Sequence, residues 1–151
     1  MIYQLLVNQL MDIADLILFQ IDKTGKVVKH HSQREFEKRG MNITVEQWVL
    51  LKIIHEKMPI SQTDLAEFSL RDPASITRTL DILSKKNLTE RQQIKGNRRQ
   101  YNVMLTEEGL KFVEKHLPFV KEQRAQSVKG LSGNDQKELT RILKIIQANM
   151  H

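Results

Sequence analysis

Basic side chains are concentrated in one central segment of this chain, between Ser69 and Gln100. The segment holds eight lysines and arginines against three acidic residues, and so carries nearly all of the net charge of +6. Such a cluster can bind phosphate, which makes nucleic acids candidate partners. A charge run is more often a solvated surface, so the local architecture has to decide. The basic residues are Arg71, Arg78, Lys85, Lys86, Arg91, Lys95, Arg98 and Arg99.

The other reactive residue types are poorly arranged for catalysis or metal binding. The chain has no cysteine, which excludes disulfides, zinc–thiolate sites and cysteine nucleophiles. The motifs of serine hydrolases, zinc proteases and phosphate-binding loops are absent as well. His30 and His31 are adjacent, so on a helix they point about 100° apart and cannot form an i, i+4 ligand pair. We therefore expect no enzyme, no cofactor and no metal site.

The basic segment includes a helix that begins at Pro73. Asp72 is a natural N-cap, and proline suits the first helical position because its missing N–H is not needed there. At 3.6 residues per turn, Ile76, Leu80 and Leu83 form one stripe that faces the core. The opposite face is small and hydroxylic near its start and basic later. It carries Ala74, Thr77, Arg78, Asp81 and Lys85.

A helix precedes this one and a hairpin follows it. Ser61 starts the earlier helix as an N-cap, and we expect Leu65 and Phe68 to be buried. After Asn87 the apolar pattern changes from period 3.6 to period two, which predicts strands over 88–94 and 101–105. The Gly-Asn pair at 96–97 suits a tight turn, so the tip of the hairpin should be cationic.

Helix, helix and basic hairpin in this order are typical of a winged helix-turn-helix, which binds DNA. Small residues at the start of the second helix allow close approach to bases, and Arg78 can bind a guanine through its forked donors. The first helix offers free N–H groups to phosphate, and the wing contacts phosphate or the minor groove. We expect DNA contacts from Ser61, Gln62, Thr63, Pro73, Ala74, Ser75, Thr77, Arg78, Lys95, Asn97, Arg98 and Arg99.

The flanking segments are helical and rich in apolar residues. Residues 5–39 predict one long helix, with Gly25 as the place for a bend. Thr44 and Gln47 form a capping box for a central core helix, and Ile60 can form a brief strand. Later helices begin after Thr106, with Pro118 as a place for a bend, and after Ser132. Both ends carry more apolar surface than a small monomer can bury, which indicates a dimer.

The sequence thus predicts a mainly α fold with a small β-hairpin wing. Residues 1–151 form a single domain, with a winged helix-turn-helix lobe over 44–110 and dimerisation helices over 1–40 and 118–151. No run of about eighteen apolar residues could span a bilayer, and the first residues lack the basic start of a secretion signal. We expect a cytoplasmic protein.

The chain resembles the MarR-type transcription regulators. The resemblance runs from Ile43–Trp48 through 65–66 and 72–78 to the end of the wing at 99–109. It implies a homodimeric regulator, in the first instance a repressor, that binds a pseudo-palindromic operator with half-sites roughly 34 Å apart. Family members have an Asp two residues before the wing arginine, where this chain has Asn97. Either the wing is looser and more positive here, or Asn97 is simply a turn residue.

The resemblance also implies a small anionic or aromatic effector. Trp48 could line its cavity, although a lone Trp among Val and Ile is more often a core residue. Arg34, Lys38 and Lys52 are candidates to bind an anion, and nothing in the sequence selects one of them. An alternative function is a winged-helix protein-interaction module without DNA readout. The observation behind this alternative is the acidic residue Asp81 on the exposed helix face.

Overall fold

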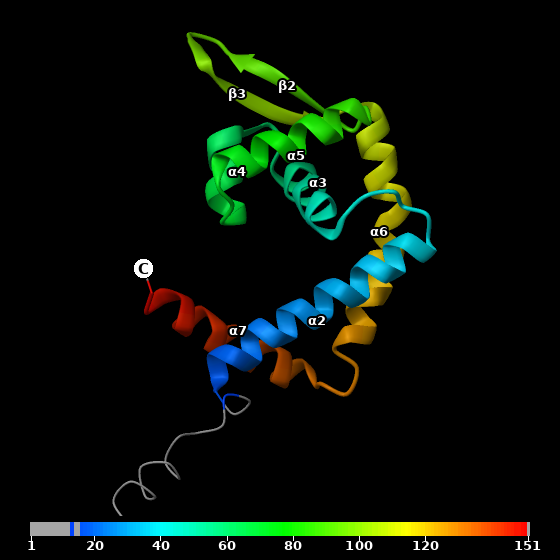
Figure 1. The fold of residues 1–151 in the computed structure, drawn as a ribbon, viewed down its shortest axis with the longest axis vertical. Coiled ribbons are helices and arrows are strands. Elements are labelled where there is room, and N and C mark those ends of the chain that lie inside the picture. The colour runs from blue at the N-terminus through cyan, green and yellow to red at the C-terminus, as the bar shows by residue number, and fades with distance from the viewer. Residues whose placement is uncertain (1–12, 14–15, 151) are drawn as a thin grey trace, which may run out of the picture. The chain divides into compact units, whose positions relative to one another are not determined.

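The computed structural model describes residue 13 and residues 16–150, and it is mainly helical with one small sheet (Figure 1). The predicted fold class is confirmed. These residues divide into two compact units between Val113 and Glu114. The elements are α2 (Ile17–Lys38), α3 (Val45–Lys57), β1 (Ile60–Ser61), α4 (Gln62–Ser69), α5 (Pro73–Lys85), β2 (Thr89–Ile94), β3 (Asn97–Leu105), α6 (Glu107–Ser127) and α7 (Gly133–Ala148).

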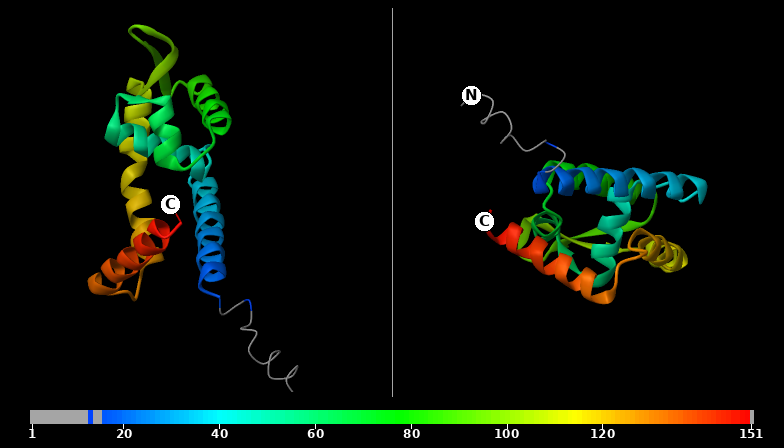
Figure 2. Two further views of the ribbon diagram at one scale, coloured as in Figure 1. Left: turned by 90° about the vertical axis from the view of Figure 1, so that its left-hand side faces the viewer. Right: turned by 90° about the horizontal axis from the view of Figure 1, so that it is seen from below.

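Helix α2 is one continuous helix (Figure 2) and passes through Gly25 without the expected bend. The part of the predicted helix over residues 5–12 lies outside the described residues. Phe36 is the buried residue of α2. Ile17, Leu18 and Val27 are 68%, 62% and 60% exposed, so this helix presents apolar side chains to its surroundings.

Helix α3 forms the centre of the core in the first unit. The predicted capping box is present: the Thr44 hydroxyl accepts from the backbone N–H of Gln47, and the Gln47 side chain accepts from the N–H of Thr44. Trp48 is buried and packs edge to face against Phe36, with 6.2 Å between the ring centroids. Val49 faces outward and is 43% exposed, because α3 is covered on most but not all of its circumference.

Helices α4 and α5 form the helix-turn-helix. Leu70 ends α4 in the left-handed conformation, and the N–H of Arg71 then donates to the carbonyl of Ala66 at 3.1 Å. Asp72 caps α5 as predicted, and the stripe of Ile76, Leu80 and Leu83 is buried. The expectation for Phe68 is wrong. Its ring is 59% exposed, with the Lys57 ammonium 4.4 Å above it, because α4 instead buries Leu65 and Ala66.

The three strands form an antiparallel sheet in the order β1-β3-β2. Ile60 pairs with Val103, which confirms the brief strand predicted at Ile60. The hairpin turn differs from the prediction. Ile94 pairs with Asn97, so the turn residues are Lys95 and Gly96 rather than Gly96 and Asn97, and Gly96 supplies the positive φ of 85°.

Thr106 begins α6 as predicted. Its hydroxyl accepts from the N–H of Gly109 at 2.9 Å and donates to the carbonyl of Asn87 at 2.6 Å, which fixes the start of α6 to the chain before β2. Helix α6 continues through Pro118. Helix α7 has the predicted capping box between Ser132 and Asp135, and none of its residues is buried. Over the described ranges, no helix is both long and apolar enough to cross a membrane.

Candidate nucleic-acid interface

A groove of about 860 Å³ runs between the helix-turn-helix and the hairpin. The hairpin projects beyond α4 and α5 (Figure 1), so the groove is open to a large partner. Residues from all three predicted groups of DNA contacts line it, which the sequence spacing alone could not establish. These are Gln62 and Thr63 from α4, Pro73 and Thr77 from α5, and Arg99 from the wing.

The start of α4 is only partly free to bind a ligand. The Ser61 hydroxyl oxygen accepts from the N–H of Asp64 at 2.9 Å and so serves as the helix cap. Gln62 uses both ends of its amide within the protein. Thr63 is exposed on the first turn and lines the groove. Thr63 is therefore the member of this predicted group whose side chain is most available to phosphate.

The start of α5 is exposed as predicted. Pro73, Ala74, Thr77 and Arg78 are exposed, whereas Ser75 is half-buried. Arg78 does not line the groove and projects from the outer surface of α5. Its guanidinium is thus placed for a partner that covers α5, such as a DNA major groove.

Arg71 holds the start of α5 from inside, and the sequence analysis did not assign it a role. Its Nη2 donates to the Ser75 hydroxyl at 2.6 Å and to the Thr79 hydroxyl at 2.9 Å. Arg71 is partly buried, so these contacts are shielded from water. The Ser75 hydroxyl oxygen, predicted to contact DNA, already accepts this internal bond.

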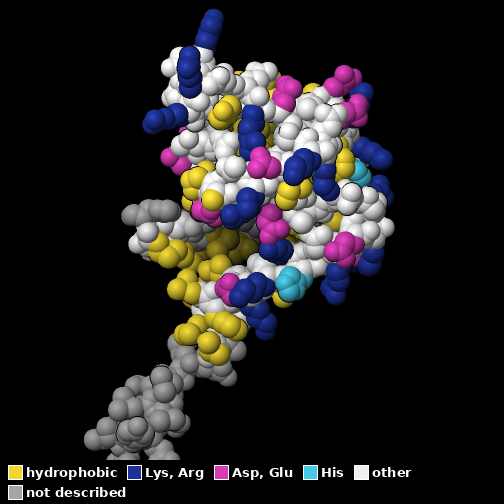
Figure 3. Space-filling view, turned by 45° about the horizontal axis from the view of Figure 1, so that its top comes forward, with side chains coloured by type: hydrophobic (Ala, Val, Ile, Leu, Met, Phe, Trp, Pro, Cys, Tyr) yellow, Lys and Arg dark blue, Asp and Glu magenta, His cyan; other side chains and the backbone are white. Residues whose placement is uncertain are grey.

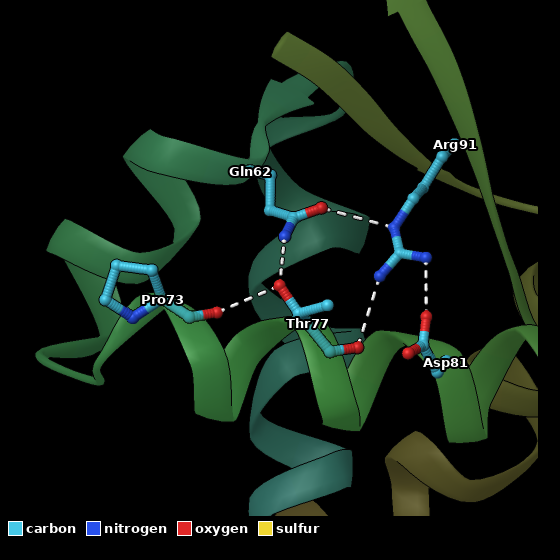
Figure 4. Close-up of polar contacts among 5 residues, drawn as sticks. All are labelled: Gln62, Pro73, Thr77, Asp81 and Arg91. Carbon is cyan, nitrogen blue, oxygen red and sulfur yellow. Dashed lines mark hydrogen bonds and ion pairs between the residues drawn. The ribbon is translucent and has the colours of Figure 1, made fainter. Parts of the chain in front are cut away.

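A second arginine, Arg91 on β2, connects the hairpin to both helices (Figure 4). Its Nε donates to Gln62 Oε1 at 3.2 Å, its Nη1 pairs with Asp81 Oδ1 at 2.7 Å, and its Nη2 donates to the carbonyl of Thr77 at 3.2 Å. Gln62 in turn donates to the Thr77 hydroxyl at 2.8 Å. One guanidinium thus contacts α4 and α5 together.

The alternation of buried and exposed residues along β2 is a sequence signal for the direction of Arg91. On β2, Thr89 is buried, and Arg91 lies two residues later on the same face of the strand. That alternation directs Arg91 toward the helices rather than outward. Asp81, the acid on the exposed face of α5, is the partner it meets there.

The tip of the wing is exposed and basic. Lys95, Arg98 and Arg99 are all exposed, and Figure 3 shows basic side chains extending from the tip of the hairpin. Asn97 is the first residue of β3, directly after the turn, and its Oδ1 accepts from the backbone N–H of Arg99 at 3.0 Å. Gln93 pairs with Tyr101 and Ile94 with Asn97, so the residues from Arg98 to Gln100 lie outside the regular ladder.

The residues proposed for an effector are dispersed. Trp48 is 2% exposed and belongs to the core. Lys38 and Lys52 pair with Glu35 and Glu56 on their own helices. Arg34 lines a shallow cavity of about 420 Å³ together with Val27, His30 and Gln33. In the part of the chain that the structure describes, no group of three or more His, Asp or Glu residues could hold a metal ion.

Comparisons with known proteins agree with this geometry. The model of the MarR family matches residues 43–101. The chain is 39% identical over 74 residues to the uncharacterized HTH-type transcriptional regulator YhbI of Bacillus subtilis, across 49% of this chain and about half, 48%, of YhbI. It is 25% identical over 126 residues to the regulator YkoM of the same organism, across 83% of this chain and 79% of YkoM.

The fold is similar to that of a solved structure containing DNA. The S. aureus MepR–DNA complex superimposes with a TM-score of 0.80 and 21% sequence identity, over 89% of this chain and 98% of the MepR chain. The likeness covers both the winged lobe and the flanking helices. At this identity it establishes the fold.

Proposed function

Because this chain belongs to the MarR family, we propose that it is a sequence-specific DNA-binding transcription regulator. The observation that carries the proposal is the groove in which α4, α5 and a basic wing meet. A major groove about 12 Å wide admits one helix, and the exposed side of α5 has the small and cationic residues that base contact needs. The protein would then act in the cytoplasm.

The three predicted groups of residues take different roles in this proposal. Thr63 and the backbone N–H groups at the start of α4 anchor phosphate. Ala74, the methyl group of Thr77 and Arg78 contact bases, with Arg78 as the main specific donor, since the Thr77 hydroxyl is already bonded to Gln62 and to the Pro73 carbonyl. Lys95, Arg98 and Arg99 bind the flanking backbone or the minor groove. Ser61 and Ser75 support these contacts as a cap and as an acceptor for Arg71.

We propose that the protein acts as a homodimer through its terminal helices, over 1–40 and 118–151. The support is the apolar surface that each helix leaves uncovered. Ile17 and Leu18 on α2 are more than three fifths exposed. Leu139 and Ile145 on α7 are 50% and 48% exposed. Apolar area of this kind stabilises an assembly when a second copy covers it.

The proposal also covers whether the protein represses or activates transcription, and what controls its binding to DNA. Binding at an operator would repress transcription by excluding other proteins from the site. A small anionic or aromatic effector would then release the DNA, and Arg34 is the candidate with a cavity beside it. Titration of a DNA-bound sample with salicylate tests this step, since release by benzoate-type anions but not by chloride is the expected result.

Selection of bound sequences from a random DNA library tests the main proposal. We expect palindromic sites with half-sites about one helical turn apart. Affinity for a selected site should fall steeply with salt, because each phosphate contact releases counterions. Binding that depends on neither sequence nor salt would contradict the proposal.

A protein-interaction module without DNA readout is the alternative. The observation behind it is the acidic residue Asp81 on the exposed face of α5. In the structure, Asp81 forms an ion pair with Arg91 of the same chain, so its position does not require a protein partner. Recovery of a protein partner with no retardation of any genomic DNA fragment would favour this alternative.

A further inference from the structure

The wing and the recognition helix α5 are joined by the side chain of Arg91, in which each of the three guanidinium nitrogens donates a hydrogen bond. Arg91 lies on β2 opposite Val103, in the middle of the hairpin ladder. Its Nε, Nη1 and Nη2 each point at a different acceptor, on Gln62, Asp81 and Thr77. The planar guanidinium is suited to such a fork, which the point charge of a lysine cannot reproduce.

The ion pair at the centre of this network has an unexpected position. Asp81 is 52% exposed on the side of α5 that should face DNA, where a carboxylate opposes phosphate binding. Arg91 is 26% exposed, and its cationic group faces this carboxylate at 2.7 Å rather than projecting into solvent. The two charges largely cancel as seen by a polyanion. The pair therefore contributes little to attraction, and its effect has to come from geometry.

The geometry matters because the hairpin is a lever. The tip residue Lys95 lies four residues beyond Arg91, or roughly 13 Å at about 3.3 Å per strand residue. A small rotation of the hairpin about Arg91 moves the tip farther than it moves the strand residues next to Arg91. The contacts of α5 and those of the tip must fit one duplex simultaneously, so their relative position affects sequence selection.

Resting on the proposed DNA-binding function, we propose that Arg91 and Asp81 form a positioning pair that fixes the wing relative to α5. The pair sets the register between base contacts made from α5 and flanking contacts made from the tip. Neither residue is a base-contacting residue. Gln62 and Thr77 complete the arrangement, since the same guanidinium holds the side chain of one and the carbonyl of the other.

Two conservative variants test the pair, each in the whole 151-residue chain. Asp81→Asn removes the ion pair and also removes a negative charge from the DNA-facing surface. Arg91→Lys keeps the positive charge but loses the fork. Glu90→Gln is the matched control, because Glu90 is an exposed acid on the neighbouring strand position and lies outside the network. Affinity is measured by fluorescence anisotropy for a duplex selected from random DNA and for a random-sequence duplex, at several salt concentrations.

We expect both Asp81→Asn and Arg91→Lys to lower the ratio of selected-site to random-site affinity by about tenfold, comparable to losing one base-specific contact. The salt slope of Arg91→Lys should equal that of the wild type, since no phosphate contact is lost. The double variant should be no worse than either single variant, because both disrupt one interaction. Glu90→Gln should leave the ratio unchanged. Thermal melting confirms that all variants are folded.

Other results overturn the inference. If Asp81→Asn tightens binding to both duplexes as Glu90→Gln does, Asp81 is only a charge. If Arg91→Lys keeps the full ratio, the forked contacts of Arg91 do not set the register. If Arg91→Ala lowers the salt slope by about one unit, Arg91 is a phosphate contact. If the wild type binds both duplexes equally, the proposed function itself fails and the pair has no register to set.

Discussion

The backbone of Gly109 packs against the carbonyl group of Leu88, and a β-carbon at position 109 would lie 2.0 Å from that oxygen. Beside this contact, the Thr106 hydroxyl donates to the carbonyl of Asn87 at 2.6 Å. The first turn of α6 is thereby fixed to the residues that lead into β2. The base of the wing is consequently held against α6, and only glycine fits at the closest point of approach.

Gly109→Ala should therefore destabilise the protein by about 3 kcal/mol, at the upper end of the cost of overpacking, because the clash is with backbone. Urea unfolding followed by circular dichroism measures this change. Gly25→Ala is the control, since a β-carbon there meets nothing within 4 Å and the position is inside helix α2. It should stabilise the protein by about 0.5–1 kcal/mol. Equal stabilities of the two variants would contradict the packing described for Gly109.

Arg78 and Arg99 should differ in what their loss does to DNA binding. Arg78→Ala should cost about 1–3 kcal/mol at the selected site and relax base preference, because a base contact is lost. Arg99→Ala should weaken binding to all sequences more evenly and reduce the salt slope. Competition with point-mutated duplexes measures both effects. If neither variant changes affinity, the interface is on another surface.

Asn97→Asp introduces the acid that the family resemblance leads one to expect before the wing arginine. The turn should persist, because a carboxylate oxygen can accept from the N–H of Arg99 as the amide does. The added negative charge at the tip should lower affinity for operator and random DNA alike, by severalfold at low salt, with a shallower salt slope. Asn134→Asp on α7 makes the same change of charge and should have no such effect. An equal effect of both variants would show that only net charge matters.

The ion pair between Lys29 on α2 and Glu46 on α3 should make stability depend on pH. The hydrogen bond from Lys29 is the main cause that lowers the pKa of Glu46 below its usual 4.5, against a smaller opposing effect of burial. A lowered pKa in the folded state stabilises the protein above about pH 4.5, and this contribution is lost as the pH falls through the folded pKa.

Lys29→Gln should thus lower the urea midpoint at pH 7 slightly, as expected for a half-exposed pair, and the difference from wild type should vanish once the pH is below the lowered folded-state pKa of Glu46. Lys23→Gln, an exposed lysine on the same helix, serves as the control. A difference between Lys29→Gln and wild type that persists unchanged at low pH would rule out the carboxylate as its source.

The caps and the apolar stripes were predictable from the sequence because they depend on local chemistry. Thr44, Asp72 and Ser132 each cap the helix expected of them, since a short polar side chain before an apolar run has few other uses. The buried stripe of α5 followed from helical period alone. The predicted position of the hairpin turn was one residue too far along the chain. Gly96 and Asn97 both suit a turn by residue type, whereas the turn is formed by Lys95 and Gly96.

The contacts between elements were not predictable, because they depend on how distant segments meet. Phe68 looked like a core residue by spacing, yet α4 turns its other side to the core. Arg71 and Arg91 counted only as members of a basic cluster, whereas each serves to hold α5. Which arginines face inward depends on the sheet register and the turn between the helices, and neither is fixed by local sequence.

The residues from Arg98 to Gln100 lie outside the paired ladder of the hairpin, while the pairs from Thr89–Leu105 to Gln93–Tyr101 stay in register. An irregular segment at a tip tolerates changes of length, since no cross-strand pair has to shift. The reach and charge of the wing can therefore change over evolutionary time without refolding the sheet below it. The tip of this wing could therefore be replaced at these positions by tips of different length from other winged proteins, with the network at Arg91 left intact.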